Sequence, residues 1–233
     1  MREPKPRLLM LITLSELGGA QTAVALLLPG LVGEFEVTLA AQGSGPLRDA
    51  AEAAGVRYVE LSHVRRPIDP WHDALALVEL IRLCRRIRPE IVHAHSSKMG
   101  VLGRLAAWVA RVPIRILTVH GWSFAAYNGF TRSLFLWIER LMRPVTTTVV
   151  CVAEATREAG LVARTCDLRL SESLAVTRLL RSSRSARSTT GLRAAETRSA
   201  SSRPPPRTRV TGRRPVSRFV AGRLTAAQSS GRS

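Results

Sequence analysis

The sequence predicts an α/β domain built on a parallel sheet with helices on both faces. Up to about residue 160, short aliphatic runs alternate with helical patterns, an order typical of βαβ units. Several runs are apolar throughout, as strands covered on both faces should be. The chain has 233 residues, 45% of them hydrophobic, which is enough for a buried core of this kind.

Strands and helices are expected in strict alternation. We expect strands at 7–14, 35–39, 56–61, 91–95, 115–120 and 147–152, and helices at 20–31, 47–54, 70–88, 98–110, 130–142 and 153–161. The helix over 70–88 has the clearest signals, because Asp69-Pro70 favours a helix start and Arg88-Pro89 a stop. Gly55 suits a left-handed cap at the end of the preceding helix.

The chain changes character after Arg164. The formal charge is +18, from 35 basic and 17 acidic residues, yet residues 1–164 hold 20 basic and 14 acidic residues, while 165–233 hold 15 and 3. Only 12 of the last 69 residues are Leu, Ile, Val or Phe. So few apolar residues cannot offset the ordering entropy of a highly charged segment. We therefore expect a domain over 1–164 and a largely disordered, basic Arg/Ser/Pro-rich tail over 165–233.

Cysteine usage and hydropathy limit the class of protein. Cys84, Cys151 and Cys166 are odd in number and lack CxxC spacing, which favours a reducing compartment over a disulfide framework or a zinc site. No run reaches 18 apolar residues, so an integral membrane protein is disfavoured and a cytoplasmic location is expected. The helix over 130–142 mixes aromatic residues with arginines. Packing against the sheet is the first interpretation, and peripheral contact with an anionic membrane is the second.

Candidate chemistry lies in the loops that follow the strands, because ligands of open parallel sheets collect at the strands' carboxyl ends. After the first strand, Gly18 and Gly19 remove the Cβ atoms that would hold a ligand away, and the next helix presents free N–H groups to an anion such as a diphosphate. The alternative is a tight turn that needs glycine for a positive φ. The loop is not GxGxxG, which disfavours a nicotinamide-dependent dehydrogenase.

After the fourth strand come Ser96, Ser97 and Lys98. Either serine can cap the following helix, and Lys98 places a cation at its first turn, where an anionic acceptor or phosphate could bind. His93 and His95 share one face of the strand, but no third ligand is spaced to join them. We therefore expect no metal there and interpret both histidines as core or crevice residues.

After the fifth strand, His120 is followed by glycine and is expected to reach the crevice, where imidazole can donate to a sugar hydroxyl or a phosphate oxygen. Trp122 and Phe124 offer flat faces for a sugar ring or lipid, or else form a hydrophobic lid on the core. After the sixth strand, Glu154 sits near a helix N-terminus, for binding or for simple compensation of the helix dipole.

Five stretches in this order resemble the N-terminal, Rossmann-like domain of GT-B glycosyltransferases of family 4. They are Leu17-Gly-Gly-Ala-Gln21, Ile91-Val-His-Ala-His-Ser-Ser-Lys-Met-Gly-Val-Leu-Gly-Arg104, Thr118-Val-His-Gly-Trp122, and Ile138-Glu-Arg140 followed by Val150-Cys-Val-Ala-Glu154. The resemblance covers about residues 7–163. It implies transfer of a sugar from a nucleotide-sugar to a glycan or lipid-linked acceptor, with retention of configuration, in polysaccharide biosynthesis. It implies no metal and no cofactor beyond the nucleotide-sugar co-substrate.

The resemblance also implies roles for single residues. Gly18 and Gly19 would line the donor diphosphate, and His120 would lie beside the donor sugar at the reacting centre. Ser96, Ser97 and Lys98 would lie on the acceptor side. Gln21, Trp122 and Glu154 lie in the matching stretches and are further candidates.

The chain departs from the family in two places. The family has a second Rossmann-like domain that holds the nucleotide, and nothing in 165–233 resembles it; Ala153 also stands where the family commonly has serine. We therefore expect the acceptor-side half of a glycosyltransferase, inactive alone. An abrupt switch to an Arg/Ser/Pro mixture is what a GC-rich gene gives when translated out of frame, which is our first interpretation of the tail. The competing function is nucleic-acid binding through that tail, which the lack of any RRM or helix-turn-helix signature disfavours.

Overall fold

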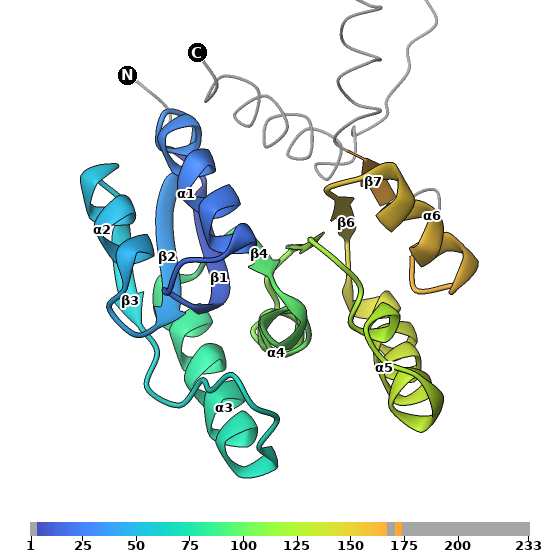
Figure 1. The fold of residues 1–233 in the computed structure, drawn as a ribbon. Helices are drawn as coiled ribbons and strands as arrows, with labels where there is room; N and C mark the ends of the chain where they lie inside the picture. The colour runs from blue at the N-terminus through green and yellow to red at the C-terminus, as the bar shows by residue number, and fades with distance from the viewer. Residues whose placement is uncertain (1–3, 167–170, 174–233) are drawn as a thin grey trace, which may run out of the picture.

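In the computed structural model, which describes residues 4–166 and 171–173, seven parallel strands form one sheet (Figure 1). Their spatial order is β3-β2-β1-β4-β5-β6-β7. The strands are β1 (Arg7–Leu14), β2 (Glu36–Gln42), β3 (Arg57–Glu60), β4 (Ile91–His95), β5 (Ile114–Val119), β6 (Thr148–Cys151) and β7 (Ser171–Ser173). The helices are α1 (Gly19–Val32), α2 (Pro46–Ala53), α3 (Pro70–Ile87), α4 (Ser97–Val109), α5 (Gly129–Leu141) and α6 (Glu154–Val162), with short 3-10 turns η1 (Ser123–Ala125) and η2 (Arg143–Val145).

The six expected strands and six expected helices are all present, so the predicted α/β class is confirmed. The largest shift concerns the second strand, which was expected to end at residue 39 and runs to Gln42. The fifth strand ends at Val119, which leaves His120 in the loop. The domain also extends past the expected boundary at residue 164. Thr165 and Cys166 are buried, and β7 pairs with β6 in parallel. The remainder of the predicted tail lies outside the described residues.

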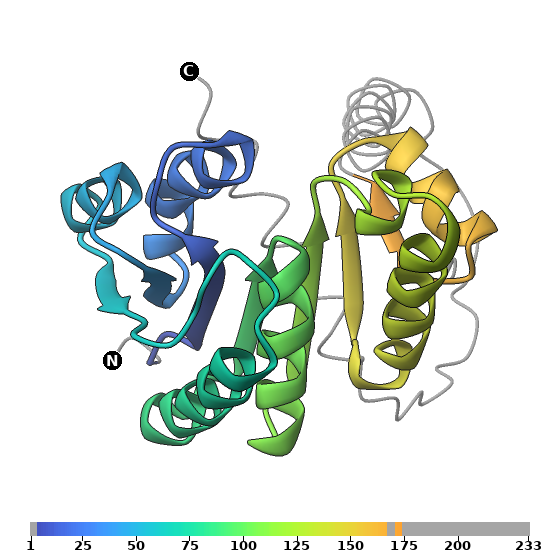
Figure 2. The ribbon, with the colours of Figure 1, turned by 60° about the horizontal axis from the view of Figure 1, so that its bottom comes forward.

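The helices cover the two faces of the sheet unequally (Figure 2). Helices α1 and α2 pack on one face, whereas α3, α4 and α5 pack on the other, and α6 lies beside β6 and β7. Because side chains alternate along a strand, neighbouring residues of β1 pack on opposite faces of the sheet: Met10 packs under α1 and α2, and Leu11 packs under α3 and α4. The central strand β1 is almost completely buried for this reason.

Local sequence signals fix the boundaries of α3. The Asp69 carboxylate accepts hydrogen bonds from the backbone N–H groups of Trp71 and His72, which caps the first turn, and Pro70 occupies the first helical position. The helix ends at Arg88, which adopts a left-handed φ of 51°. Gly55 has a φ of 71° after α2, as its predicted left-handed cap requires.

The strand order reverses direction between β1 and β4. Moving outward from β1, the chain adds β2 and β3 on one side, then returns through α3 to add β4 on the other. At such a switch point the two neighbouring loops diverge to opposite faces and leave a crevice at the carboxyl ends of the strands. The glycine loop before α1 and the serines before α4 flank this position.

Candidate functional site

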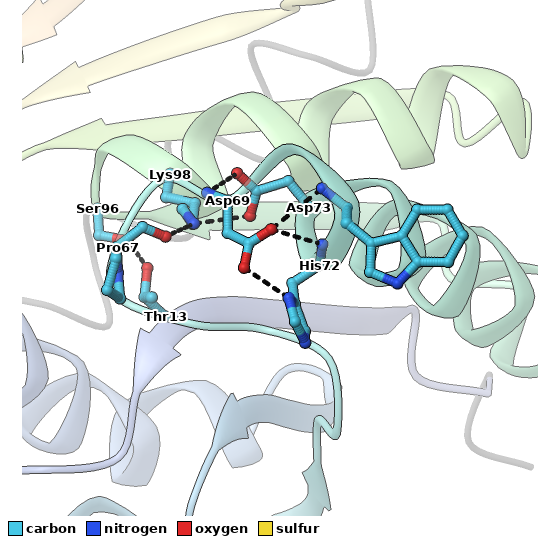
Figure 3. Close-up of polar contacts among 8 residues, drawn as sticks. Thr13, Pro67, Asp69, His72, Asp73, Ser96 and Lys98 are labelled. Atoms are coloured by element: carbon cyan, nitrogen blue, oxygen red, sulfur yellow. Dashed lines mark hydrogen bonds and ion pairs between the residues drawn. The ribbon is translucent and has the colours of Figure 1, made fainter.

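The two loops at the switch point are joined by a direct side-chain contact. Thr13 Oγ1 near the end of β1 lies 2.6 Å from Ser96 Oγ, just after β4 (Figure 3). Ser96 stands at the N-cap of α4 but makes no side-chain cap hydrogen bond, so the predicted capping role is wrong for it. Its hydroxyl instead contacts Thr13 and so links the end of β1 to the loop after β4.

The backbone of Ser96 is strained. Its φ of 68° and ψ of 161° fall in a region that is essentially restricted to glycine. Such conformations cost about 1–3 kcal/mol each and persist where surrounding contacts enforce them. Here the enforcing contacts include the bridge to Thr13 and the start of α4. Ser97 follows as the exposed first residue of that helix.

The start of α1 is open to an anion. The helix has no side-chain cap and no acidic residue in its first turn, so neither its N-cap nor its first turn compensates the first N–H groups and the positive dipole end. The alternative of a turn that needs positive φ is wrong, because Gly18 is extended, with a φ of −175°. A Cβ placed on Gly19 would meet no atom within 4 Å. The fold therefore does not require glycine at position 19.

The rest of the glycine loop is held down by the chain. Gln21 turns back, and its Nε2 donates to the carbonyl of Leu14 at 3.2 Å, so this candidate supports the loop. The buried Ser15 Oγ accepts from the backbone N–H of Gly45 at 2.7 Å. A Cβ on Gly45 would lie 2.8 Å from the Ser15 carbonyl oxygen, which makes glycine necessary at that position.

Lys98 is already paired. Its ammonium donates to Asp73 Oδ1 at 2.6 Å and to the carbonyl of Pro67, and its side chain is only 12% exposed (Figure 3). Lys98 does place a cation at the first turn of α4, as expected, and its contacts link the loop before α3 to the start of α4. Its predicted role on the acceptor side stays a prediction. Any anion bound there would compete with the Asp73 carboxylate.

Three histidines lie in a row on one face of the sheet. His93 and His95 have ring centroids 4.2 Å apart, and the rings of His95 and His120 are 5.6 Å apart. His93 Nε2 lies 2.6 Å from Thr118 Oγ1, and His95 Nδ1 lies 3.3 Å from His120 Nε2. The register explains the row, because His95 pairs with Thr118 and His120 follows two residues later.

Burial disfavours the charged form of these imidazoles. It lowers the pKa of His93 to about 3, with a smaller contribution from His120. It also lowers the pKa of His95 well below its usual value and shifts the pKa of His120 in the same direction. A neutral imidazole offers one N–H donor and one acceptor nitrogen. Nowhere in residues 4–166 do three His, Cys, Asp or Glu side chains gather closely enough to hold a metal ion.

Trp122 belongs to the core. It is 6% exposed, stacks on Phe124 at 5.4 Å and donates from Nε1 to the carbonyl of Thr156 at 2.7 Å. The expectation that Trp122 and Phe124 present flat faces to a ligand is corrected, and the alternative of a hydrophobic lid describes them. Their role is to hold the loop after β5, and so the backbone of His120, against α6.

Glu154 begins α6 beside the same edge of the sheet. Its Oε1 accepts from Arg157 at 2.7 Å, whereas Oε2 is buried without a partner among the described residues. The carboxylate also compensates the N-terminal dipole of α6, which has no side-chain cap because Ala153 stands at that position.

Sequence reasoning missed Thr13 and Asp73. Thr13 reads as one more residue of a buried strand, and Asp73 as an ordinary acidic residue in the first turn of α3. Only the juxtaposition of β1 with β4, and of α3 with α4, brings them to Ser96 and Lys98. No sequence spacing marks either contact, since each joins residues at least 25 positions apart.

Comparison with known proteins identifies similar chains. A family model described as a glycosyl transferase 4-like domain matches residues 18–165. An Escherichia coli UDP-Gal:alpha-D-GlcNAc-diphosphoundecaprenol alpha-1,3-galactosyltransferase is 33% identical over 126 residues, covering 54% of this chain and 32% of that protein. The Staphylococcus aureus capsular polysaccharide biosynthesis glycosyltransferase CapM is 29% identical over 99 residues, covering 41% and 26%.

Solved structures show the same fold at low identity. Anabaena HepE, crystallised with UDP and glucose, superposes with a TM-score of 0.58 at 15% identity, over 72% of this chain and 44% of that one. A glycosyltransferase from Rickettsia africae gives a TM-score of 0.56 at 13% identity, over 73% and 42%. The chain thus spans between about a quarter and a half of the length of these proteins.

Proposed function

Because this chain belongs to the glycosyl transferase 4-like domain family, we propose that residues 4–166 form one half of a retaining glycosyltransferase that uses a nucleotide-sugar donor. The predicted resemblance to that family and the Rossmann-like fold, the N-terminal half of a GT-B fold, are confirmed. Donor, acceptor and stereochemistry belong to the proposal.

The proposal rests on one observation above all: the loops after β1, β4 and β5 meet at a single edge of the sheet. Thr13 contacts Ser96 across the first gap, and His95 contacts His120 across the second. The uncapped start of α1 lies at the same edge. One edge of the sheet would therefore offer N–H groups to a diphosphate and an imidazole to a sugar.

The roles of the loops follow from their chemistry. Departure of the diphosphate leaves negative charge on its oxygens, and the N–H groups at Gly18 and Gly19, fixed at the uncapped start of α1, would stabilise that charge. Removing one such donor from an active site typically costs about 10²–10³ in rate. His120, at the next strand end, would donate to the sugar, and Ser96 and Ser97 would face the acceptor.

Relatives indicate the substrate class. The similar Escherichia coli protein is named for a UDP-galactose donor and a diphosphoundecaprenol-linked acceptor, and HepE was crystallised with UDP. We therefore propose a UDP-sugar donor and a glycan or lipid-linked acceptor, in the assembly of a surface polysaccharide.

Gly19→Ala tests the diphosphate site without disturbing the fold. The new methyl meets no protein atom, and alanine favours a helical first turn over glycine, so the unfolding free energy should stay constant or rise by about 0.5–1 kcal/mol. A methyl group in the path of the diphosphate should weaken UDP-glucose binding about tenfold or more. Amide NMR shifts during UDP-glucose titration measure the affinity, and urea unfolding measures the stability.

Gly33→Ala is the matched control, because its Cβ also meets nothing and it lies at the opposite end of α1. It should leave UDP-glucose binding unchanged. Equal affinities of Gly19→Ala and the unmodified chain for UDP-glucose would show that the diphosphate does not bind at this loop.

We further propose that α5 rests on an anionic membrane, close to a lipid-linked acceptor. Four large apolar residues, at 42–83% exposure, repeat every three or four positions and so line one side of the helix: Phe130, Leu134, Trp137 and Leu141. Exposed Arg132 and Arg140 lie on the same helix. The described helices include none that is long and apolar enough to cross a bilayer.

Vesicle co-sedimentation tests this contact. Trp137→Ser should lower binding of the 233-residue chain to vesicles containing phosphatidylglycerol about tenfold, since it removes an interfacial aromatic anchor. Trp108→Ser is the control, because Trp108 is 53% exposed but lies on α4. Equal losses for the two variants would show that binding is not a property of α5.

A further inference from the structure

The pairing of His95 with His120 leaves one ring nitrogen of His95 unsatisfied. His95 is 1% exposed, and its Nδ1 lies 3.3 Å from His120 Nε2. Its other nitrogen, Nε2, is buried without a hydrogen-bond partner among the described residues. His120 differs, because it is only partly buried and its Nδ1 is not among the buried unpartnered atoms.

A single hydrogen bond between two neutral imidazoles needs one N–H and one lone pair, so two arrangements are possible. If His95 carries its proton on Nε2, that N–H is a buried donor with no acceptor. If it carries the proton on Nδ1, the N–H points at His120 and only a lone pair is left unsatisfied. Buried N–H groups without an acceptor are the rarer defect in folded proteins, so the second arrangement is favoured.

We propose that His95 is a positioning residue whose Nδ1–H donates to His120 Nε2 and thereby fixes His120 in the tautomer with its proton on Nδ1. The Nδ1–H of His120 then serves as a donor toward an acceptor oxygen of a bound ligand. The nature of that ligand, a sugar hydroxyl or phosphate oxygen, rests on the proposed function. The tautomer of His120 does not depend on the proposed function.

This arrangement limits what His120 can do. Its Nε2 lone pair is occupied by His95, so it is unavailable to take a proton from an acceptor hydroxyl. His120 can orient and polarise a ligand oxygen, but it does not act as a general base through that nitrogen. His93 packs on the His95 ring and bonds Thr118, and it takes no part in the bond to His120.

Histidine NMR tests the inference directly, since the chain has five histidines. Long-range ¹H–¹⁵N correlations of the full chain, labelled in histidine, distinguish Nδ1–H from Nε2–H rings. Near pH 7.5, His95 and His120 should both show the Nδ1–H pattern. An Nε2–H pattern for His120 in the unmodified chain would overturn the proposal.

Two variants of His95 separate positioning from packing. His95→Asn retains an N–H donor at the place of Nδ1 and should keep His120 in the Nδ1–H form. His95→Leu removes the donor and should return His120 mainly to the Nε2–H form that imidazole prefers in water. His93→Leu, an equally buried change that spares the bond, should leave the tautomer of His120 as it is.

A His120 pattern that is unchanged in folded His95→Leu would contradict the positioning role. If His95→Leu does not fold, the unmodified chain and His95→Asn decide the question. Adding UDP-glucose keeps the two proposals apart. If His120 carries its proton on Nε2 and its NMR signals shift when UDP-glucose is added, only the proposed tautomer is overturned. If His120 carries its proton on Nδ1 and its signals do not change, the result counts only against the proposed donor site.

Discussion

Among single residues, the buried histidines should make the fold sensitive to acid. Burial lowers the pKa of His93 to about 3, whereas an unfolded histidine titrates near 6.5. Between these values the unfolded chain binds a proton that the folded chain does not, so stability falls as pH drops below about 6.5. For His93 alone, the loss between pH 7.5 and pH 5 should be about 2 kcal/mol.

His93→Gln tests this dependence, because its amide nitrogen can replace Nε2 in the bond to Thr118 without titrating. Urea unfolding at pH 7.5 and pH 5 should show a smaller loss of stability for the variant than for the unmodified chain. Identical losses in the two proteins would mean that His93 is not the source of the acid sensitivity.

Single-residue predictions were confirmed where the conformation of the neighbouring backbone determines the role of the residue. Gly55 adopts the expected left-handed cap, and Asp69 caps α3 from within its own turn. Sequence reasoning did not anticipate the side-chain partners of Ser96 and Lys98, which are Thr13 and Asp73. Those partners are distant in the chain, so no local pattern could reveal them.

Among the elements, α5 is held to the domain by a buried ion pair. Arg104 of α4 is 2% exposed, and its Nη2 donates to Glu139 of α5 at 2.9 Å, while its Nη1 donates to Thr146 at 2.9 Å. The same guanidinium donates to the carbonyl of Gly100. Glu139 therefore faces inward, on the side of α5 opposite its exposed apolar residues.

Glu139→Ala should destabilise the domain by about 3 kcal/mol, since it leaves the Arg104 charge buried without its counterion. Glu158→Ala, on the exposed surface of α6, is the control and should change stability by less than about 0.5 kcal/mol. Thermal or urea unfolding measures both. A small effect of Glu139→Ala would show that water or another group compensates Arg104.

Sequence periodicity identified α5 as a helix but left its orientation open between the sheet and a membrane. The helix carries apolar residues on two sides. Phe135 and Leu136 pack toward the core. The exposed apolar residues face outward: Phe130, Leu134, Trp137 and Leu141. The buried pair of Glu139 with Arg104 settles which side faces the domain. A charged residue in a helix pattern normally indicates the exposed side, which is why the sequence could not decide.

At the scale of the whole molecule, the described domain supplies one wall of the proposed pocket. The 233-residue chain by itself is expected to transfer no sugar, because residues 165–233 do not resemble the family's nucleotide-holding domain. Release of UDP from UDP-glucose or UDP-galactose, with a lipid-linked acceptor present, measures this. Turnover above the rate without protein would contradict the expectation.

The basic segment over 165–233, most of which lies outside the described residues, keeps two interpretations. Translation out of frame predicts that another frame of the coding DNA continues the domain sequence. A nucleic-acid-binding arm predicts instead that deleting 174–233, which leaves β7 in place, abolishes salt-dependent binding to RNA or DNA. The charge of +18 for the whole chain favours neither, since two thirds of it lies in that segment.

The sequence by itself determined the α/β alternation, the helix boundaries and the loops in which ligand chemistry gathers, because apolar periodicity, caps and glycines act over a few neighbouring residues. Tertiary structure alone decided which polar side chains remain available. Pairing β4 with β1 and β5 set Ser96 against Thr13 and His95 against His120, and packing α3 on α4 neutralised Lys98 with Asp73. These contacts depend on strand order and register, which join residues that local patterns never compare.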